Sequence, residues 1–189
     1  MLLIAGGVLG LVAGLLTGGS LSNLLGRRLH WPLVVIAAFA VRELLLRSPL
    51  GTSPLGPPAF ALSLAVLIAW TIWHRDELPG VLIVSAGMSM NLLVTLANGG
   101  HMPVAAAAVH LGPPQLRAVG TWAQYGVMGS GTRLGWLGDW IQFPGLVGRF
   151  FPQAYSPGDL VSLVGLFVVL FLATRPRRAD RARRAITTR

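Results

Sequence analysis

The most prominent feature of the chain is a series of apolar segments separated by short stretches rich in arginine, proline and glycine. Each segment has about 16–20 residues, close to what an α-helix needs to cross ~30 Å of hydrocarbon at ~1.5 Å per residue. The pattern predicts an all-α, polytopic transmembrane bundle of about five spans, forming a single membrane domain over residues 1–189. The predicted spans are Leu2–Leu21, Trp31–Leu50, Pro58–Trp73, Leu78–Ala97 and Ser156–Thr174.

The stretch between the fourth and fifth apolar segments, residues 98–155, has a different character. It contains many glycines and prolines and eight scattered aromatic residues. Amphipathic rings collect at the headgroup level of a membrane. We therefore expect residues 98–155 to form an external, aromatic-rich segment on the outer leaflet, with short helices at Pro103–His110 and Pro114–Tyr125.

Composition and charge support the membrane interpretation. Apolar residues make up 53% of the chain and charged residues 11%, against about 25% charged in a typical soluble domain. The fifteen basic residues are all arginine, and seven of them lie in residues 175–189, directly after an apolar run. Such a tail favours anionic lipid headgroups over nucleic acid, which would require the arginines on one folded face.

The arginines also predict an orientation. Short cytoplasmic loops are enriched in basic residues, so the tail, Gly26–His30 and His74–Glu77 are assigned to the cytoplasm, and the N-terminus to the outside. The chain is apolar from Met1, with no basic segment before it and no A-x-A cleavage site. The first apolar segment therefore indicates a retained span rather than a secretory signal.

Glycines follow one face of the first predicted helix. Gly6, Gly10, Gly14 and Gly18 are spaced by four residues, and small residues at this spacing let another helix backbone approach closely. Two interpretations stay open: packing against another helix of the same chain, or formation of a homo-oligomer.

A polar cluster is expected within the second and fourth spans. Arg42 and Glu43 interrupt the second apolar segment, and Asn91 would lie at a similar depth in the fourth. Charged residues inside a membrane usually face a polar interior and mark a functional site. The alternative is structural, because Glu43 and Arg47 have the i, i+4 spacing of a helical ion pair.

Two aspartates are candidates for catalysis. Asp139 and Asp159 are both predicted at the outer membrane face, twenty residues apart. Carboxyl groups within ~3–5 Å of each other cannot both ionise readily, so such a pair can act as acid and base on a water molecule. Alternatively, Asp159 caps a helix that begins after Ser156. There is no cysteine, and His101 and His110 lack metal-ligand spacing, so we expect no metal and no cofactor.

Four short motifs follow one another in the second half of the chain: Asn91-Leu92-Leu93-Val94, residues 98–104 (Asn-Gly-Gly-His-Met-Pro-Val), residues 132–139 (Thr-Arg-Leu-Gly-Trp-Leu-Gly-Asp) and residues 155–159 (Tyr-Ser-Pro-Gly-Asp). In their order and spacing the chain resembles an uncharacterised bacterial family of small multi-spanning membrane proteins, the domain of unknown function 5317 family. The resemblance implies a location in the bacterial plasma membrane and names Asn98, Asp139 and Asp159 as residues to test first. His101, in the same stretch, joins the candidate binding residues.

A remoter likeness is to lipoprotein signal peptidase, an aspartyl membrane peptidase. Asn98-Gly99-Gly100 is similar to its Asn-x-Gly stretch, and Asp139 and Asp159 follow the order and spacing of its two aspartates. This chain departs from that enzyme because no spans separate Asn98 from Asp139, the Asn-Leu-Ile-Asp-Arg type sequence is missing, and five spans replace four. If the likeness holds, it implies aspartyl peptidase activity.

Three functions therefore compete at the level of sequence. The first is a non-catalytic accessory or structural subunit of a membrane complex, docked through the glycine face or the external segment. The second is binding or transport of a lipid or small molecule through Arg42, Glu43 and Asn91. The third is an intramembrane hydrolase that uses Asp139 and Asp159.

Overall fold

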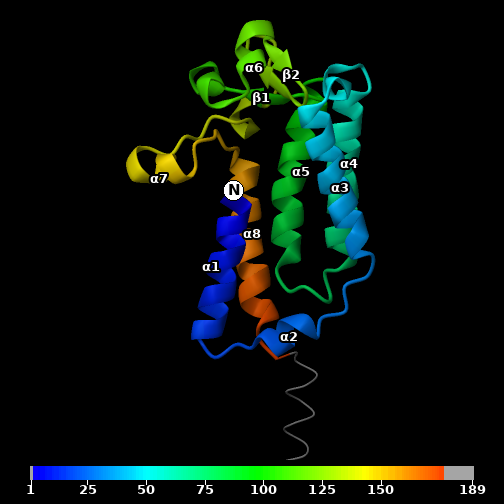
Figure 1. Ribbon diagram of the computed structural model, residues 1–189, viewed down its shortest axis with the longest axis vertical. Coiled ribbons are helices and arrows are strands. Elements are labelled where there is room, and N and C mark those ends of the chain that lie inside the picture. Colours follow the sequence, from blue (N-terminus) through cyan, green and yellow to red (C-terminus); the bar gives the residue numbers. More distant parts are fainter. Residues whose placement is uncertain (1, 177–189) are drawn as a thin grey trace, which may run out of the picture.

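Five long helices, packed side by side, dominate this computed structural model, which describes residues 2–176. Helix α8 packs against both α1 and α5, and α4 packs against both α5 and α3. Figure 1 shows α1, α8 and α5 side by side. The described chain is thus mostly helical. The long helices are α1 (Leu2–Leu16), α3 (Pro32–Arg47), α4 (Gly56–Trp73), α5 (Val81–Ala97) and α8 (Pro157–Ala173).

Each predicted apolar segment corresponds to one long helix of 15 to 18 residues. Four of these helices are shorter than the predicted segments, whereas α4 begins at Gly56, before the predicted start at Pro58. Within residues 2–176, one helix, α4, is long and apolar enough to cross a membrane, while α1, α5 and α8 are apolar but shorter. The first segment ends early because Gly18 has φ +87° and the Gly19 amide donates to the Gly14 carbonyl at 2.9 Å. A glycine in this conformation terminates helices.

One end of the bundle is held together by Arg27. It follows the short helix α2 (Leu21–Leu25), and its guanidinium donates to the carbonyls of Glu77, Leu172 and Arg175 at 3.0, 3.3 and 3.2 Å. The last carbonyls of a helix have no partner within it, so Arg27 caps α8 and ties it to the loop after α4. Of the predicted basic tail, only Arg175 and Pro176 belong to the described residues.

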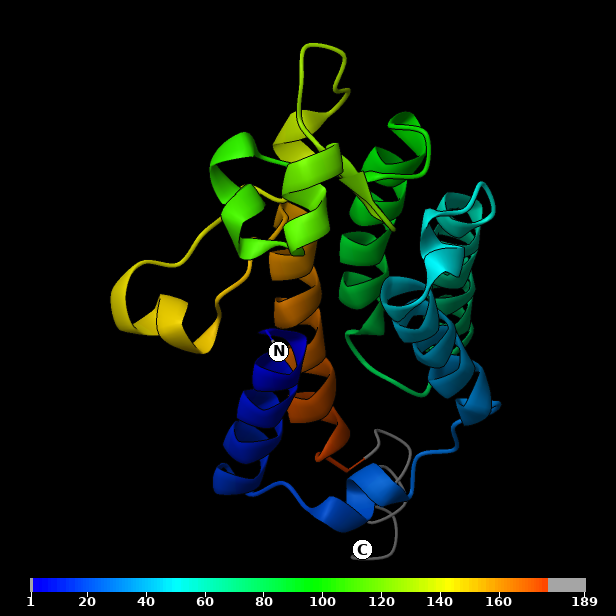
Figure 2. The same cartoon turned by 45° about the horizontal axis from the view of Figure 1, so that its top comes forward.

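A small cap covers the other end of the bundle (Figure 2). It contains a three-stranded sheet in the order β1–β3–β2, with β1 parallel to β3 and β2 antiparallel to it. The strands are β1 (Met102–Val104), β2 (Thr121–Trp122) and β3 (Tyr125–Val127), and the short helical elements are η1 (Pro49–Thr52), η2 (Ala106–Leu111), α6 (Pro114–Val119), η3 (Gly135–Leu137) and α7 (Gly145–Phe150).

The prediction of an all-α fold is therefore wrong for the cap. The expected helix Pro114–Tyr125 stops at Val119 because Gly120 has φ +80° and turns the chain. Residues 121–127 then form a hairpin with a two-residue turn, in which Trp122 pairs with Tyr125. Pro103, expected to begin a helix, lies in β1, and the helical turn starts only at Ala106.

The glycine face of α1 packs against α8. A β-carbon added at Gly6 would lie 2.8 Å from the Leu163 carbonyl oxygen, and one at Gly10 would lie 2.2 Å from that of Phe167. Gly14 makes a similar approach to α8. Gly18, predicted on the same face, lies beyond the helix end with nothing within 4 Å of its β-position. Of the two interpretations, the structure shows packing within the chain.

Helices α5 and α8 also approach at glycines. A β-carbon on Gly158 would lie 2.6 Å from the Gly87 carbonyl oxygen, and one on Gly165 would lie 2.5 Å from the Val84 amide nitrogen. Side chains there would force the backbones apart. This close crossing determines which polar groups of α5 can reach the start of α8.

Candidate functional site

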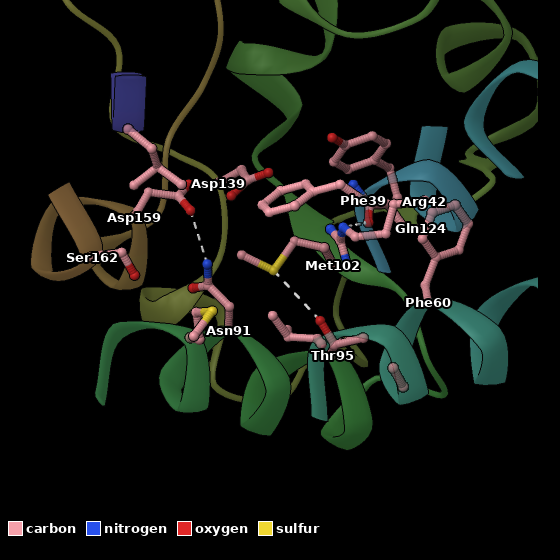
Figure 3. A pocket seen from close by; sticks show the side chains of 15 residues that line it. Phe39, Arg42, Phe60, Asn91, Thr95, Met102, Gln124, Asp139, Asp159 and Ser162 are labelled. Carbon is pink, nitrogen blue, oxygen red and sulfur yellow. Dashed lines mark hydrogen bonds between the residues drawn. The ribbon is translucent and has the colours of Figure 1, made fainter. Parts of the chain in front are cut away.

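A cavity of about 210 Å³ lies beneath the cap. Residues of all five long helices and of the cap line it, from Leu3 of α1 to Ser162 of α8 (Figure 3). Apolar side chains such as Phe39 and Leu64 form part of its wall. Its polar lining residues are Arg42, Asn91, Thr95, Gln124, Tyr125, Asp139, Asp159 and Ser162.

Asp159 is positioned by the start of α8. Ser156 is the N-cap, and its hydroxyl accepts from the Asp159 amide at 2.9 Å. In return, Oδ2 of Asp159 accepts from the Ser156 amide at 3.0 Å, which completes a capping box. This reciprocal pair fixes the carboxyl group at the cavity wall, as the capping interpretation of Asp159 predicts.

Asn91 closes the network from α5. Its side-chain amide donates to Oδ1 of Asp159 at 2.9 Å, and its oxygen accepts from the Ser156 hydroxyl at 2.8 Å. A side chain at 158 could not fit, because its β-carbon would lie 2.1 Å from the Asn91 oxygen. Both oxygens of Asp159 thus accept hydrogen bonds, which is the role of a carboxylate.

Asp139 reaches the same cavity from the cap. Its backbone extends the sheet beside β1, with its amide donating to the Pro103 carbonyl at 2.8 Å and its carbonyl accepting from Ala105 at 2.9 Å. Two residues later, Ile141 bridges to Tyr155, the residue before the N-cap of α8. These two β-bridges bring the carboxyl groups of Asp139 and Asp159 to the same side of the cavity (Figure 3).

The carboxyl group of Asp139 is buried and incompletely satisfied. The residue is 7% exposed, and its Oδ1 makes no hydrogen bond with any residue of the described range. The pKa of Asp139 is raised well above its usual value, first by burial and second by the charge of Asp159. Burial therefore favours the neutral form of Asp139, which is the form that can donate a proton.

Arg42 lies at the other end of the cavity. Its guanidinium donates to Oε1 of Gln124 at 2.7 Å and to the Ser63 hydroxyl at 3.4 Å, and lies over the Phe60 ring at 5.7 Å. Arg42 forms no ion pair with an acid among residues 2–176. The cavity is thus acidic at one end and basic at the other.

The remaining predicted binding residues lie elsewhere. Glu43 faces outward and pairs with Arg47 at 3.0 Å, with both side chains largely exposed, because neighbouring helical residues point about 100° apart. It therefore does not join Arg42 and Asn91 at the cavity. Asn98 caps the end of α5 and bonds the backbone of Arg133 at 2.8 and 2.9 Å. His101 follows in the same turn and does not line the cavity.

Several cavity residues were not found from the sequence. Gln124 and Tyr125 enter through the hairpin turn of the cap, and Ser162 lies one helical turn after Asp159. Only Ser162 had a signal, the i, i+3 spacing from Asp159 on an apolar helix. Among residues 2–176, no three His, Cys, Asp or Glu side chains gather in a group that could hold a metal ion.

Comparison with known proteins gives one match. A family model described as "Family of unknown function (DUF5317)" matches residues 28–171. The chain belongs to this family. The DUF5317 match covers α3 to α8 almost entirely, and thus every cavity residue except Leu3. No curated protein and no solved structure matches the chain.

Proposed function

We propose that this protein spans a bacterial plasma membrane several times. Many large apolar side chains on the long helices are exposed, including Leu16 at 81%, Leu33 at 73% and Leu62 at 65%. Apolar surface of this extent is costly in water and favourable in lipid. Helices of 15–17 residues span about 23–26 Å. Together with their flanking residues they match a membrane whose hydrocarbon core is at the thin end of the usual range.

The arrangement of the loops supports the proposed orientation. Arg27 contacts both the loop after α4 and the end of α8, so the segments assigned to the cytoplasm share one end of the bundle. The cap is at the opposite end (Figure 1), and Asp139 belongs to the cap because it pairs with Val104. With the Arg27 end inside, the cavity lies beneath the outer membrane face, within reach of amphiphiles in the outer leaflet.

We further propose that the protein is an aspartyl hydrolase that cleaves an acyl bond, an amide or ester, of a membrane amphiphile. One observation carries the proposal: a buried Asp139, one of whose oxygens has no hydrogen-bond partner among residues 2–176, shares a cavity with Asp159, both of whose oxygens accept hydrogen bonds. A neutral and an ionised carboxyl at one site are the arrangement that aspartic hydrolases use.

The pair can complete a balanced hydrolysis. The Asp159 carboxylate takes a proton from water as the water oxygen bonds to the acyl carbon, and Asp139 donates its proton to the carbonyl oxygen. The tetrahedral diol then collapses. A diol proton returns to Asp139, the bond to the leaving group breaks, and Asp159 gives its proton to the leaving nitrogen or oxygen. Both aspartates end in their starting states.

Hydrolysis in water labelled with heavy oxygen tests the proposal without a known substrate. Membranes from cells that express the wild type or Asp139→Asn are incubated in labelled water, and lipid and peptide extracts are compared by mass spectrometry. The wild type should generate products with a labelled carboxyl group that Asp139→Asn does not, because asparagine cannot donate a carboxyl proton.

Asp76→Asn is the matched control, since Asp76 is an exposed acid in the loop after α4. It should give the wild-type product pattern. Identical labelled products from wild type and Asp139→Asn, with both proteins inserted to the same level, would refute the hydrolase.

A role as a non-catalytic accessory subunit stays a prediction. Two docking surfaces were predicted for such a subunit, and one of them, the glycine face of α1, is covered by α8. Binding of an amphiphile without hydrolysis is the second candidate, and the position of Arg42 in the cavity favours it.

A further inference from the structure

The basic end of the cavity contains an arginine that forms no ion pair with an acid of residues 2–176. Arg42 uses two of its five N–H donors on Gln124 and Ser63, and the other three find no acceptor within that range. Both acceptors are neutral, and the charges of Asp159 and Glu43 act on Arg42 only from a distance, without direct contact.

Gln124 adds donors of the same kind. Its Oε1 accepts from Arg42, and its NH₂ group, which also interacts with the Tyr125 hydroxyl, is the second polar group of the side chain at the cavity wall. A guanidinium and a neighbouring amide together form a fork of N–H donors that suits an oxyanion, a carboxylate or a phosphate.

Apolar side chains continue from this point into the bundle. Phe39 lies three residues before Arg42 on α3, and Leu64 lies four residues after Phe60 on α4, so each is on the cavity-facing side of its helix. Since α3 runs toward the cap and α4 away from it, both lie about one turn deeper than Arg42 (Figure 1). An alkyl chain beneath the oxyanion would contact them.

The size of the cavity indicates that it holds only part of a larger ligand. At about 210 Å³, the cavity is smaller than the ~300–1,000 Å³ of sites that enclose a whole drug-sized ligand. Asn91 and Thr95, which line it along α5, are four residues and so about 6 Å apart. This spacing indicates that the acidic and basic ends of the cavity are far enough apart to hold two different groups of one amphiphile.

We propose that Arg42 and Gln124 bind the oxyanion of an anionic lipid-like substrate while its acyl bond lies at Asp139 and Asp159. The geometry that carries this is a guanidinium at one end of the cavity that forms no ion pair within residues 2–176, two aspartates at the other end, and apolar side chains one turn deeper. This oxyanion site rests on the proposed function in one respect, because it takes the same cavity as the substrate site. The oxyanion goes to the Arg42 end because Asp159 repels it.

Binding is measured on Asp139→Asn protein in non-ionic detergent, so that no hydrolysis interferes. The probes are oleate, oleoyl lysophosphatidate and neutral monoolein, titrated calorimetrically, with an acidic hexapeptide that has no alkyl chain as the fourth. We expect the oxyanion probes to bind at least about tenfold more tightly than monoolein, or about 1.4 kcal/mol. A preference for only one of them supports the proposal and identifies the source as carboxylate or phosphate.

Variants on one helix separate the site from general surface charge. Arg42→Gln should reduce the oxyanion preference to about onefold, whereas Arg47→Gln, which removes an exposed arginine of α3, should leave it unchanged. Gln124→Glu is the second variant. It keeps an oxygen that accepts from Arg42, so the contact between α3 and the cap survives, and its negative charge offsets that of the guanidinium.

Three results would overturn the inference: a preference that survives both Arg42→Gln and Gln124→Glu, an equal loss in Arg47→Gln, or hexapeptide binding as tight as that of oleate. Each leaves the hydrolase proposal standing, because no hydrolysis is measured. Conversely, an intact oxyanion preference without labelled hydrolysis products would refute the hydrolase and leave the binding site.

Discussion

Substitution of Gly10 should show how closely α1 must approach α8. An alanine β-carbon at this position would lie 2.2 Å from the Phe167 carbonyl oxygen and 2.8 Å from the Phe167 carbonyl carbon. Both are backbone atoms, so no side-chain rotation relieves the contact. The helices must separate by about 1 Å to restore ordinary contact distances, and overpacking of this kind costs about 1–3 kcal/mol.

Gly7→Ala is the matched control on the same helix. Its β-carbon would meet the ends of the Leu170 and Leu166 side chains at 3.2 and 3.4 Å, which can move. Both substitutions share the gain of about 1 kcal/mol in helix propensity, so their difference isolates the contact. Gly10→Ala should unfold with a free energy about 1–3 kcal/mol below that of Gly7→Ala.

The assay is unfolding of the purified protein in mixed micelles, followed by tryptophan fluorescence as the denaturing detergent increases. Equal free energies of unfolding for the two variants would refute the close α1–α8 packing. If Gly10→Ala instead converted an oligomer into monomers with unchanged stability, the glycine face would be an oligomer interface, and the packing described above would be incorrect.

Three further predictions concern the network and its charges. Arg27→Gln should lower the free energy of unfolding by about 1.5–3 kcal/mol, since several carbonyls lose a charged donor, while the exposed Arg28→Gln should change it little; the same micelle titration measures both. Asn91→Leu should cost about 1–3 kcal/mol and abolish labelled hydrolysis products, because Ser156 and Asp159 each lose a buried partner; full activity in this variant would exclude Asn91 from the site. Because folding raises the pKa of Asp139, the folded state binds its proton more tightly, so the free energy of unfolding should fall as pH rises from about 4 through the raised pKa. Asp139→Asn should remove that component of the slope, and hydrolysis by the wild type should decline as the pH rises through the raised pKa; a wild-type pH slope equal to that of the variant would contradict the raised pKa.

The apolar pattern predicted the helices because it repeats over many residues. It did not predict the cap, where strands of two or three residues are held by backbone pairing between distant segments, such as Met102 with Tyr125. Short pairings of this kind have too little periodicity to be recognised in one sequence.

At the site, the sequence predicted the contacts between residues that are close in the chain, but not those between residues that are far apart in it. The capping box at Ser156 and Asp159 follows from spacing alone. The placement of Asp139 and Asp159 in one cavity depends on β-bridges through Val104 and Tyr155, and no sequence motif predicts these bridges. Glu43 illustrates the opposite error: equal depth suggested a cluster with Arg42, but the helical rotation between adjacent residues turns Glu43 away.

The central claim is that Asp139 carries a proton in the cavity that it shares with Asp159. Infrared difference spectra between wild type and Asp139→Asn in lipid, recorded at about pH 6 and therefore about two units above the ordinary aspartate pKa, test it most directly. The account predicts a protonated-carboxyl C=O band in the wild type that Asp139→Asn lacks. Spectra in which the substitution removes only a carboxylate band would show that Asp139 is ionised and would contradict the account.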